Sequence, residues 1–186
     1  GIISDADIPE TNEFIDALPV SVIKKTDTGW SEIGVDLDIN DTVRLCEFKL
    51  SDALSQHTPN LLITPKMGEQ VEVSLERFEF VSDLIKIIKK QKGVGLFVDY
   101  GFVHNVPGET LQAVKEHKPC SVLDHPGEAD LTAHVNFAEM SRQLLEEGMT
   151  VHGAVSQGLF LTQLGIYHRA GALHQNATQG QGEDID

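Results

Sequence analysis

The sequence predicts an α/β fold of the doubly wound, Rossmann-like type, and three consecutive features predict it. Leu75–Gln91 has the apolar spacing of an amphipathic helix. Val94–Val98 follows it and is apolar throughout, as expected of a parallel strand that is covered on both faces. Asp99 then lies at the carboxyl end of this strand, where doubly wound sheets bind their ligands.

A β-hairpin is predicted ahead of this helix and strand. Val20–Lys25 and Ser31–Asp38 are the two strands, because apolar residues alternate with polar ones through the second of them. Thr26–Gly29 between them has the residue types of a hairpin turn. Two further strands are expected over residues 43–48 and 70–74.

The predicted helix carries its apolar residues on one face. Phe78, Val81, Ile85 and Ile88 follow one another at spacings of three, four and three, and charged residues occupy the other faces. Gly93 then ends the helix.

The stretch after the buried strand is predicted to be less regular. A short helix is expected around Glu109–His117, and a loop rich in turn and polar residues over Lys118–His134. Alternating residues over Val151–Val155 predict another strand, and residues 158–166 form a compact apolar segment.

A second amphipathic helix is predicted just after the polar loop. Asn136 and Glu139 form a capping-box pattern, in which each side chain bonds to the backbone of the other. Met140 and Leu144 supply apolar positions, and Gly148 ends the helix.

The composition indicates one domain or part of one. The chain has 186 residues, and 40% of them are apolar, which is enough to form a core. We expect residues 1–170 to form the folded part, and 171–186 to be a disordered acidic tail with little to bury. Because the sequence starts at Gly1 without a Met or a leader, we expect it to be a fragment.

The charge and the cysteines exclude several classes of function. A net charge of −15 would repel a phosphate backbone, so we expect no nucleic acid partner. No apolar run approaches the roughly 18 residues of a membrane helix, so we expect no membrane span. Cys46 and Cys120 lack the spacing of a disulfide framework or a zinc site and are expected to be reduced thiols.

The first candidate for chemistry is a polar group just before the hairpin. Asn12, Glu13 and Asp16 place an amide and two carboxylates within five residues. One interpretation is a loop that projects these groups into a cleft. The other is a helix that begins at Asn12, with the acidic residues in its first turn. The residues alone leave both interpretations open.

A second candidate set has the residue types of a metal site, namely His125, Glu128, Asp130 and His134. A proline–glycine pair interrupts the set, and the rigid spacing of zinc ligands is missing, so we expect no metal. No nucleophile motif supports covalent catalysis. Gly93–Gly95 precedes its strand rather than following one, and therefore does not form a phosphate loop.

Several short motifs occur in order along residues 12–169. They are Asn12-Glu13-Phe14, Asp16-Ala17-Leu18-Pro19-Val20, Gly29-Trp30, Asp99-Tyr100-Gly101, Pro126-Gly127 and the segment from Asp130 to Phe137. Phe160-Leu161, Leu164-Gly165-Ile166 and Arg169 follow, and resemble a closing strand–helix region. Together these motifs resemble the MidA-like S-adenosylmethionine-dependent methyltransferases, whose mitochondrial members are arginine methyltransferases that act in the assembly of respiratory complex I.

The resemblance implies a fold and a cofactor. The fold would be part of a doubly wound methyltransferase with a β-hairpin insertion, and its amino-terminal strands would be missing from this sequence. The cofactor would be S-adenosylmethionine, although the glycine-rich turn that holds it is also missing. The implied function is methyl transfer to an arginine of a complex I subunit, with this fragment inactive by itself.

The resemblance also implies roles for single residues. Glu13 would bind the acceptor guanidinium, Asn12 would contact cofactor or substrate, and Asp16 would hold the loop or act as a second acid. The mouth of the substrate site would be lined by Phe14, Asp99, Tyr100 and His134.

Partners and compartment follow from the same resemblance. It implies a protein substrate and a location in the mitochondrial matrix, or in the cytoplasm if the protein is bacterial, and it leaves self-association into a homo-oligomer open. Two alternatives use the same residues differently. The chain could be a truncated, non-catalytic module that binds a partner protein, or a metal-dependent hydrolase built on the histidine and acidic set of residues 125–134.

Overall fold

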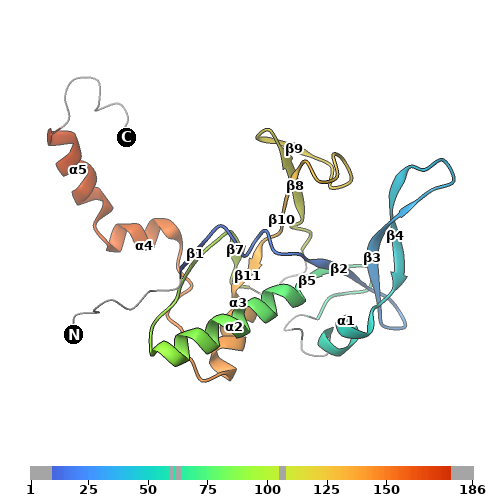
Figure 1. Cartoon of the computed structure of the whole chain (residues 1–186), viewed down its shortest axis with the longest axis horizontal. Helices are drawn as coiled ribbons and strands as arrows, with labels where there is room; N and C mark the ends of the chain where they lie inside the picture. The colour runs from blue at the N-terminus through green and yellow to red at the C-terminus, as the bar shows by residue number, and fades with distance from the viewer. Residues whose placement is uncertain (1–9, 59–60, 62–63, 105–107, 177–186) are drawn as a thin grey trace. The chain divides into compact units, whose positions relative to one another are not determined.

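The computed structural model describes residues 10–58, 61, 64–104 and 108–176 (Figure 1). The chain divides after Val151 into two compact units. Helices, antiparallel strands and parallel strand pairs occur together in the first unit, so the predicted α/β class is confirmed.

A four-stranded antiparallel sheet contains the predicted hairpin. Its strands run in the order β4 (Val43–Lys49), β3 (Trp30–Leu37), β2 (Ser21–Lys25) and β5 (Gln70–Val73). Ile23 of β2 lies opposite Val71 of β5 and is fully buried. Leu54 of α1 (Asp52–His57), a helix that the sequence did not predict, packs into the same core. The sheet therefore has its own hydrophobic core.

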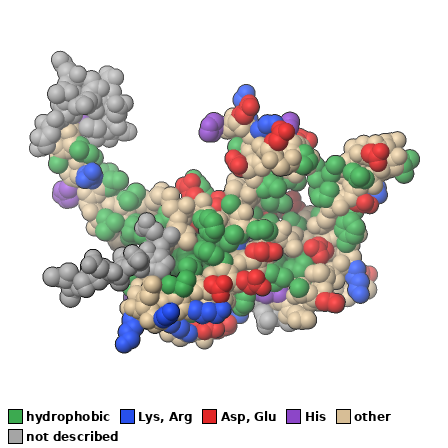
Figure 2. All heavy atoms as spheres, in the orientation of Figure 1, with side chains coloured by type: hydrophobic (Ala, Val, Ile, Leu, Met, Phe, Trp, Pro, Cys, Tyr) green, Lys and Arg blue, Asp and Glu red, His purple; other side chains and the backbone are tan. Residues whose placement is uncertain are grey.

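Helix α2 (Leu75–Gln91) has the predicted bounds. The Ser74 hydroxyl caps it by accepting a hydrogen bond from the Arg77 N–H at 3.0 Å. Lys92 adopts a left-handed conformation, and the N–H of Gly93 donates to the Ile88 carbonyl at 3.1 Å, which closes the last turn. Basic side chains gather where α2 ends (Figure 2), where they complement the helix dipole.

Helix α3 (Phe137–Glu146) packs beside α2 (Figure 1). Val81 and Ile85 of α2 and Leu144 of α3 form a second buried cluster. The Asn136 half of the predicted capping box is confirmed, because the Asn136 side chain accepts a hydrogen bond from the N–H of Glu139 at 3.1 Å.

Two short parallel strand pairs accompany these helices. β1 (Glu10–Asn12) pairs with β6 (Leu96–Val98), and β7 (Gly101–Phe102) pairs with β11 (Val135–Asn136). The predicted strand after α2 is therefore confirmed, but its burial on both faces is not. Val94 and Leu96 are exposed, and within the described residues β6 pairs with β1 alone.

The prediction of a helix around Glu109–His117 is wrong. The segment forms β8 (Gln112–Lys115), which pairs with β9 (Lys118–Cys120) and with β10 (Asp130–Thr132). Glu116 and His117 both have positive φ, 50° and 61°, the conformation of a two-residue hairpin turn. The predicted loop after it therefore contains two strands.

The second unit contains α4 (Gln157–Gln163) and α5 (Ile166–Asn176). The prediction of a strand at Val151–Val155 is wrong. Alternation alone does not form a strand when no described strand pairs with it. Helix α5 continues past the expected boundary at residue 170, and the rest of the expected tail, residues 177–186, lies outside the described residues. None of the described helices is long and apolar enough to cross a membrane.

Candidate functional site

The candidate site lies at the carboxyl ends of the parallel strands β1 and β6. Asn12 of β1 lies opposite Val98 of β6, so the residues that follow them leave the pair at the same edge. The Glu13 N–H donates to the Val98 carbonyl at 3.0 Å, and Glu13 has a left-handed φ of 49°. This conformation ends the strand and begins a turn, which we call the exit loop, residues 13–16. The interpretation of a helix capped by Asn12 is therefore wrong.

The carboxylate of Asp99 binds the backbone N–H groups of the exit loop. One carboxylate oxygen of Asp99, Oδ2, accepts hydrogen bonds from the N–H groups of Phe14, Ile15 and Asp16 at 3.2, 2.8 and 3.4 Å. The other oxygen, Oδ1, accepts from the Tyr100 N–H at 2.9 Å. Both oxygens of Asp99 are thus used within the protein, and the residue shapes the site instead of reaching out from it.

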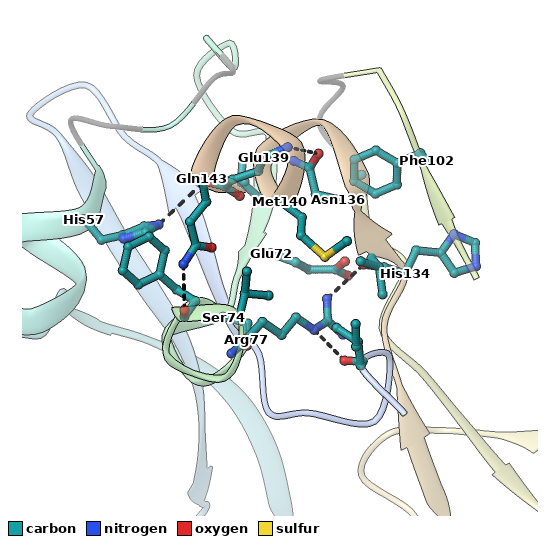
Figure 3. A pocket seen from close by; sticks show the side chains of 16 residues that line it. His57, Glu72, Ser74, Arg77, Phe102, His134, Asn136, Glu139, Met140 and Gln143 are labelled. Carbon is teal, nitrogen blue, oxygen red and sulfur yellow. Dashed lines mark hydrogen bonds and ion pairs between the residues drawn. The ribbon is translucent and has the colours of Figure 1, made fainter. Parts of the chain in front are cut away.

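The guanidinium of Arg77, in α2, binds the backbone carbonyl groups of the same loop (Figure 3). Its Nε donates to the Ile15 carbonyl at 2.8 Å, and its Nη2 donates to the Asp16 carbonyl at 2.9 Å. The same guanidinium donates to the carbonyls of Ala133 and His134 at 2.7 and 2.9 Å. Arg77 therefore ties the exit loop to the segment that leads into β11.

Burial shapes the electrostatics around Arg77. Desolvation lowers the pKa of the Arg77 guanidinium, while the charges of Asp99, Glu72 and Asp16 act in the opposite direction. An arginine stays protonated in any case. The guanidinium is therefore a fixed positive charge behind the exit loop.

Asp16 is the buried carboxylate of the site, with 7% of its surface exposed. Desolvation, followed by the nearby charge of Asp99, raises the pKa of Asp16 above 3.8. The Ala133 N–H donates to its backbone carbonyl at 3.0 Å. Asp16 therefore helps to anchor the loop and holds a proton more readily than an ordinary aspartate.

Glu13 and Tyr100 are exposed neighbours at the two strand exits. The Glu13 carboxylate lies beside the Tyr100 hydroxyl, and its charge is the main cause that raises the pKa of Tyr100 above 10. Phe14 lies between them and the α2 side, and its ring contacts the ring of Phe80 at a centroid distance of 5.2 Å. The exit loop thus presents one carboxylate with an aromatic hydroxyl beside it.

His134 reaches the site through its backbone. Its carbonyl accepts from Arg77, and its N–H donates to the Thr110 hydroxyl at 2.8 Å. The imidazole points away from the Arg77 guanidinium (Figure 3) and is exposed. The structure thus gives the backbone of His134 a role in fixing the site and leaves its predicted contact with substrate untested.

A pocket of about 70 Å3 lies on the other side of Arg77. Its lining includes Phe78, Met140 and Gln143, but not Asn12, Glu13 or Tyr100. The amide of Gln143 donates to the Phe78 carbonyl at 2.8 Å (Figure 3). The pocket adjoins the exit loop through Ile15 and Arg77, but its lining does not include the acidic residues at the strand exits.

The expected absence of a metal site stays an expectation. Two residues of the predicted ligand set contact Lys115. The Lys115 ammonium lies 3.3 Å from the ring of His125 and also binds the carboxylate of Glu128. Asp130 and His134 are not part of that contact. Within the described ranges, no three histidine, cysteine or acidic residues are grouped as metal ligands.

Of the residues predicted from the sequence, Asn12, Glu13, Asp16, Asp99 and Tyr100 are brought together at the two strand exits. Sequence reasoning missed Arg77. The only sequence signal for Arg77 was its position in the first turn of a predicted helix, where the helix dipole favours acidic residues over cations.

Comparison with known proteins identifies relatives of this arrangement. The family model of S-adenosyl-L-methionine-dependent methyltransferases matches residues 6–155. The mitochondrial protein arginine methyltransferase NDUFAF7 homologue of Caenorhabditis elegans is 34% identical over 168 residues, which cover 88% of this chain and 38% of that protein. The Drosophila melanogaster homologue is 36% identical over 158 residues, covering 82% of this chain and 36% of that protein. The chain thus spans somewhat over a third of the length of these relatives.

Two crystal structures from Burkholderia thailandensis share the fold. One, of an uncharacterized superfamily protein, has a TM-score of 0.78 at 23% identity and covers 95% of this chain and 49% of that protein. The other, of a protein bound to S-adenosyl-homocysteine, has a TM-score of 0.73 at 24% identity and covers 91% of this chain and 46% of that protein. Both show what fold the chain adopts.

Proposed function

The chain belongs to the family of S-adenosyl-L-methionine-dependent methyltransferases, and on this premise we propose that it forms the acceptor side of a protein arginine methyltransferase. The relatives named as mitochondrial protein arginine methyltransferases support a protein arginine as the acceptor. We place the donor side of the cleft in the part of the relatives' length that this chain does not span.

The observation that carries this proposal is the group of carboxylates at the exits of β1 and β6. Glu13, Asp16 and Asp99 interact there, and the charge of Asp99 contributes to the raised pKa of Asp16. Arg77 offsets part of this repulsion from behind the loop, and a second cation placed beside the exposed Glu13 would relieve it further. In the described part of the chain no lysine or arginine forms an ion pair with Glu13. Its carboxylate is therefore suited to an incoming guanidinium.

Each group at the exits has a proposed role. Glu13 accepts hydrogen bonds from two guanidinium nitrogens and draws positive charge away from the third. The Tyr100 hydroxyl fixes the direction of the Glu13 carboxylate. Asp16, which is buried, supports the exit loop and serves as the second acid of the site. Phe14, exposed beside Glu13, and His134 form the rim toward the substrate.

S-adenosylmethionine, when bound, supplies an electrophilic methyl group on a sulfonium sulfur. The cofactor would supply this methyl group to the acceptor nitrogen and keep the electron pair of its sulfur–carbon bond, and the nitrogen would then lose one proton to solvent. The guanidinium is protonated at neutral pH, so orientation must free the lone pair of the attacking nitrogen. Glu13 provides this orientation and opposes the extra positive charge until the proton leaves to solvent.

The described residues fit only the edge of a cofactor site. Doubly wound folds hold a nucleoside cofactor where a strand passes through a glycine-rich turn into a helix. No described strand is followed by such a turn, and β5, which leads to α2, ends at Val73 with Ser74 as the helix cap. Asn12, at the exit of β1, is the one residue to which we assign a cofactor contact. We accordingly propose that these 186 residues do not catalyse the transfer alone.

The acceptor and the compartment are finer parts of the proposal. The resemblance to mitochondrial arginine methyltransferases supports an arginine of a respiratory complex I subunit as the acceptor. It also supports action in the mitochondrial matrix, or in the cytoplasm if the protein is bacterial.

The proposal is tested by incubating the full-length gene product with methyl-tritiated S-adenosylmethionine and protein extract from a strain that lacks the gene. Acid hydrolysis should release radioactive methylarginine, and the 186-residue chain by itself should produce none and should show no micromolar cofactor binding in calorimetry. Label recovered only in other amino acids would refute the arginine assignment. Micromolar binding by the chain alone would show that it contains the cofactor site.

A further inference from the structure

The exit loop is held from two sides by two charged side chains. Its N–H groups donate to the carboxylate of Asp99, and its carbonyls accept from the guanidinium of Arg77. Hydrogen bonds to ionised groups are stronger than those between neutral groups. The backbone of the loop is therefore fixed by its two strongest partners, and these partners approach from β6 and from α2.

Arg77 also fixes the loop relative to a second segment. The same guanidinium binds the carbonyls of Ala133 and His134, just before β11. The Val135 N–H donates to the Tyr100 carbonyl at 2.8 Å, so this segment in turn contacts the residue that lies beside Glu13. Arg77 thus connects both sides of the candidate site.

Neither side chain can be replaced by a near relative. A lysine ammonium has three donors on one atom and cannot reach four carbonyls that surround a planar fork. An asparagine at position 99 has a single oxygen, so it cannot accept from the loop and from Tyr100 on opposite sides. The geometry requires an arginine and an aspartate.

We propose that Arg77 and Asp99 are positioning residues that jointly fix the exit loop, so that the Glu13 carboxylate points at the acceptor. This inference rests on the proposed function of Glu13, and it moves Asp99 from the substrate mouth to the support of the loop. Neither residue touches the acceptor. Their loss should therefore disturb the direction of Glu13 and leave cofactor affinity unchanged.

The first test measures the loop without any substrate. Amide hydrogen exchange is followed in the full-length protein for Arg77→Lys and Asp99→Asn. Exchange of the N–H groups of residues 14–16 should accelerate by roughly tenfold to a hundredfold, the range for losing a hydrogen bond to a charged group. Exchange in β2 should stay unchanged. Matched controls are the exposed Arg44→Lys and Asp83→Asn, each of which alters a surface ion pair.

The second test measures the direction of Glu13. Carbon-13 NMR of ring-labelled tyrosine reports the pKa of Tyr100, which should fall toward 10 in Arg77→Lys as Glu13 moves away. A role limited to stability would leave this pKa unchanged in the folded fraction. If Asp99→Asn loses protection in β2 as well, Asp99→Glu is measured in its place, because it keeps the charge but displaces the oxygens.

The third test links position to turnover. In both variants kcat should fall by roughly a hundredfold, the loss caused by misplacement of about 1 Å, with the cofactor Kd unchanged. Unchanged loop exchange, an unchanged Tyr100 pKa or undiminished kcat would each overturn the inference. If the unmodified protein yields no methylarginine, the proposed function fails, whereas the exchange and NMR results still decide whether the two residues hold the loop.

Discussion

The Glu13 carboxylate lies beside the Tyr100 hydroxyl and raises its pKa. The two residues are 87 positions apart in the sequence, and they meet because β1 and β6 are parallel neighbours in register. A parallel pair brings its carboxyl ends to one edge, so side chains that follow the two strands become neighbours. This contact makes the state of Glu13 measurable through a tyrosine.

The substitution Glu13→Gln should lower the pKa of Tyr100 toward its ordinary value near 10. The charge of Glu13 is the main cause of the raised pKa, and the amide of glutamine carries no charge. Ultraviolet difference titration near 295 nm measures the phenol, in a Tyr167→Phe background that removes the other tyrosine. An unchanged Tyr100 pKa would show that Glu13 does not face the hydroxyl.

The substitution Asp16→Asn should make stability less dependent on pH. Because burial raises the folded pKa of Asp16 above 3.8, the folded state binds more protons than the unfolded state between the two pKa values. The free energy of unfolding contributed by this group therefore falls as pH rises through that window. Urea unfolding of both proteins from about pH 3 to 7 should show the variant gaining stability relative to the parent as pH rises. A difference that stays constant or shrinks would contradict this sign.

The substitution Gly101→Ala should disrupt the pairing of β7 with β11. A Cβ at this position would lie 2.2 Å from the Val135 carbonyl oxygen and 2.7 Å from the Phe137 ring. Overpacking of this kind costs about 1–3 kcal/mol or more, because backbone must move. Gly93→Ala is the matched control, since a Cβ there meets nothing within 4 Å. Thermal unfolding should show a lower Tm for the first variant only; equal Tm values would refute the contact.

The two hydrophobic cores should respond separately to truncation. Ile23→Ala in the four-stranded sheet and Ile85→Ala in α2 should each cost about 2–5 kcal/mol, because both side chains are buried. Because the residues belong to separate clusters, the double variant should show the sum of both losses in urea unfolding. Fully exposed Ile39→Ala should cost less than about 0.5 kcal/mol. Strong non-additivity would show that the two cores are one.

Local sequence signals predicted some elements well. The bounds of α2 agree with the prediction because the apolar spacing and Gly93 both point to the same helix. The Asn136 cap is a contact within four residues and could be predicted for the same reason. The hairpin of β2 and β3 was found from alternation and a turn.

Features that depend on distant partners could not be predicted. The strand β8 was mistaken for a helix because its pairing with β10, 16 to 20 positions away, leaves no local pattern. The exposure of Val94 and Leu96 depends on which elements pack against the faces of this strand region, and a local apolar run does not show them. Arg77 went unnoticed because the carbonyls that it binds, at residues 15–16 and 133–134, carry no side-chain signal. The acidic residues were predictable as candidates, and their convergence required the fold.

The central claim is that Glu13 orients the acceptor guanidinium, and methyl transfer by Glu13→Gln tests it most directly. In the full-length protein, production of radioactive methylarginine should fall by roughly 10²–10³-fold, the loss typical of removing one group that stabilises developing charge. The cofactor Kd should stay unchanged, and the exposed control Glu79→Gln should behave like the parent. Undiminished methylarginine formation by Glu13→Gln would contradict the role assigned to Glu13.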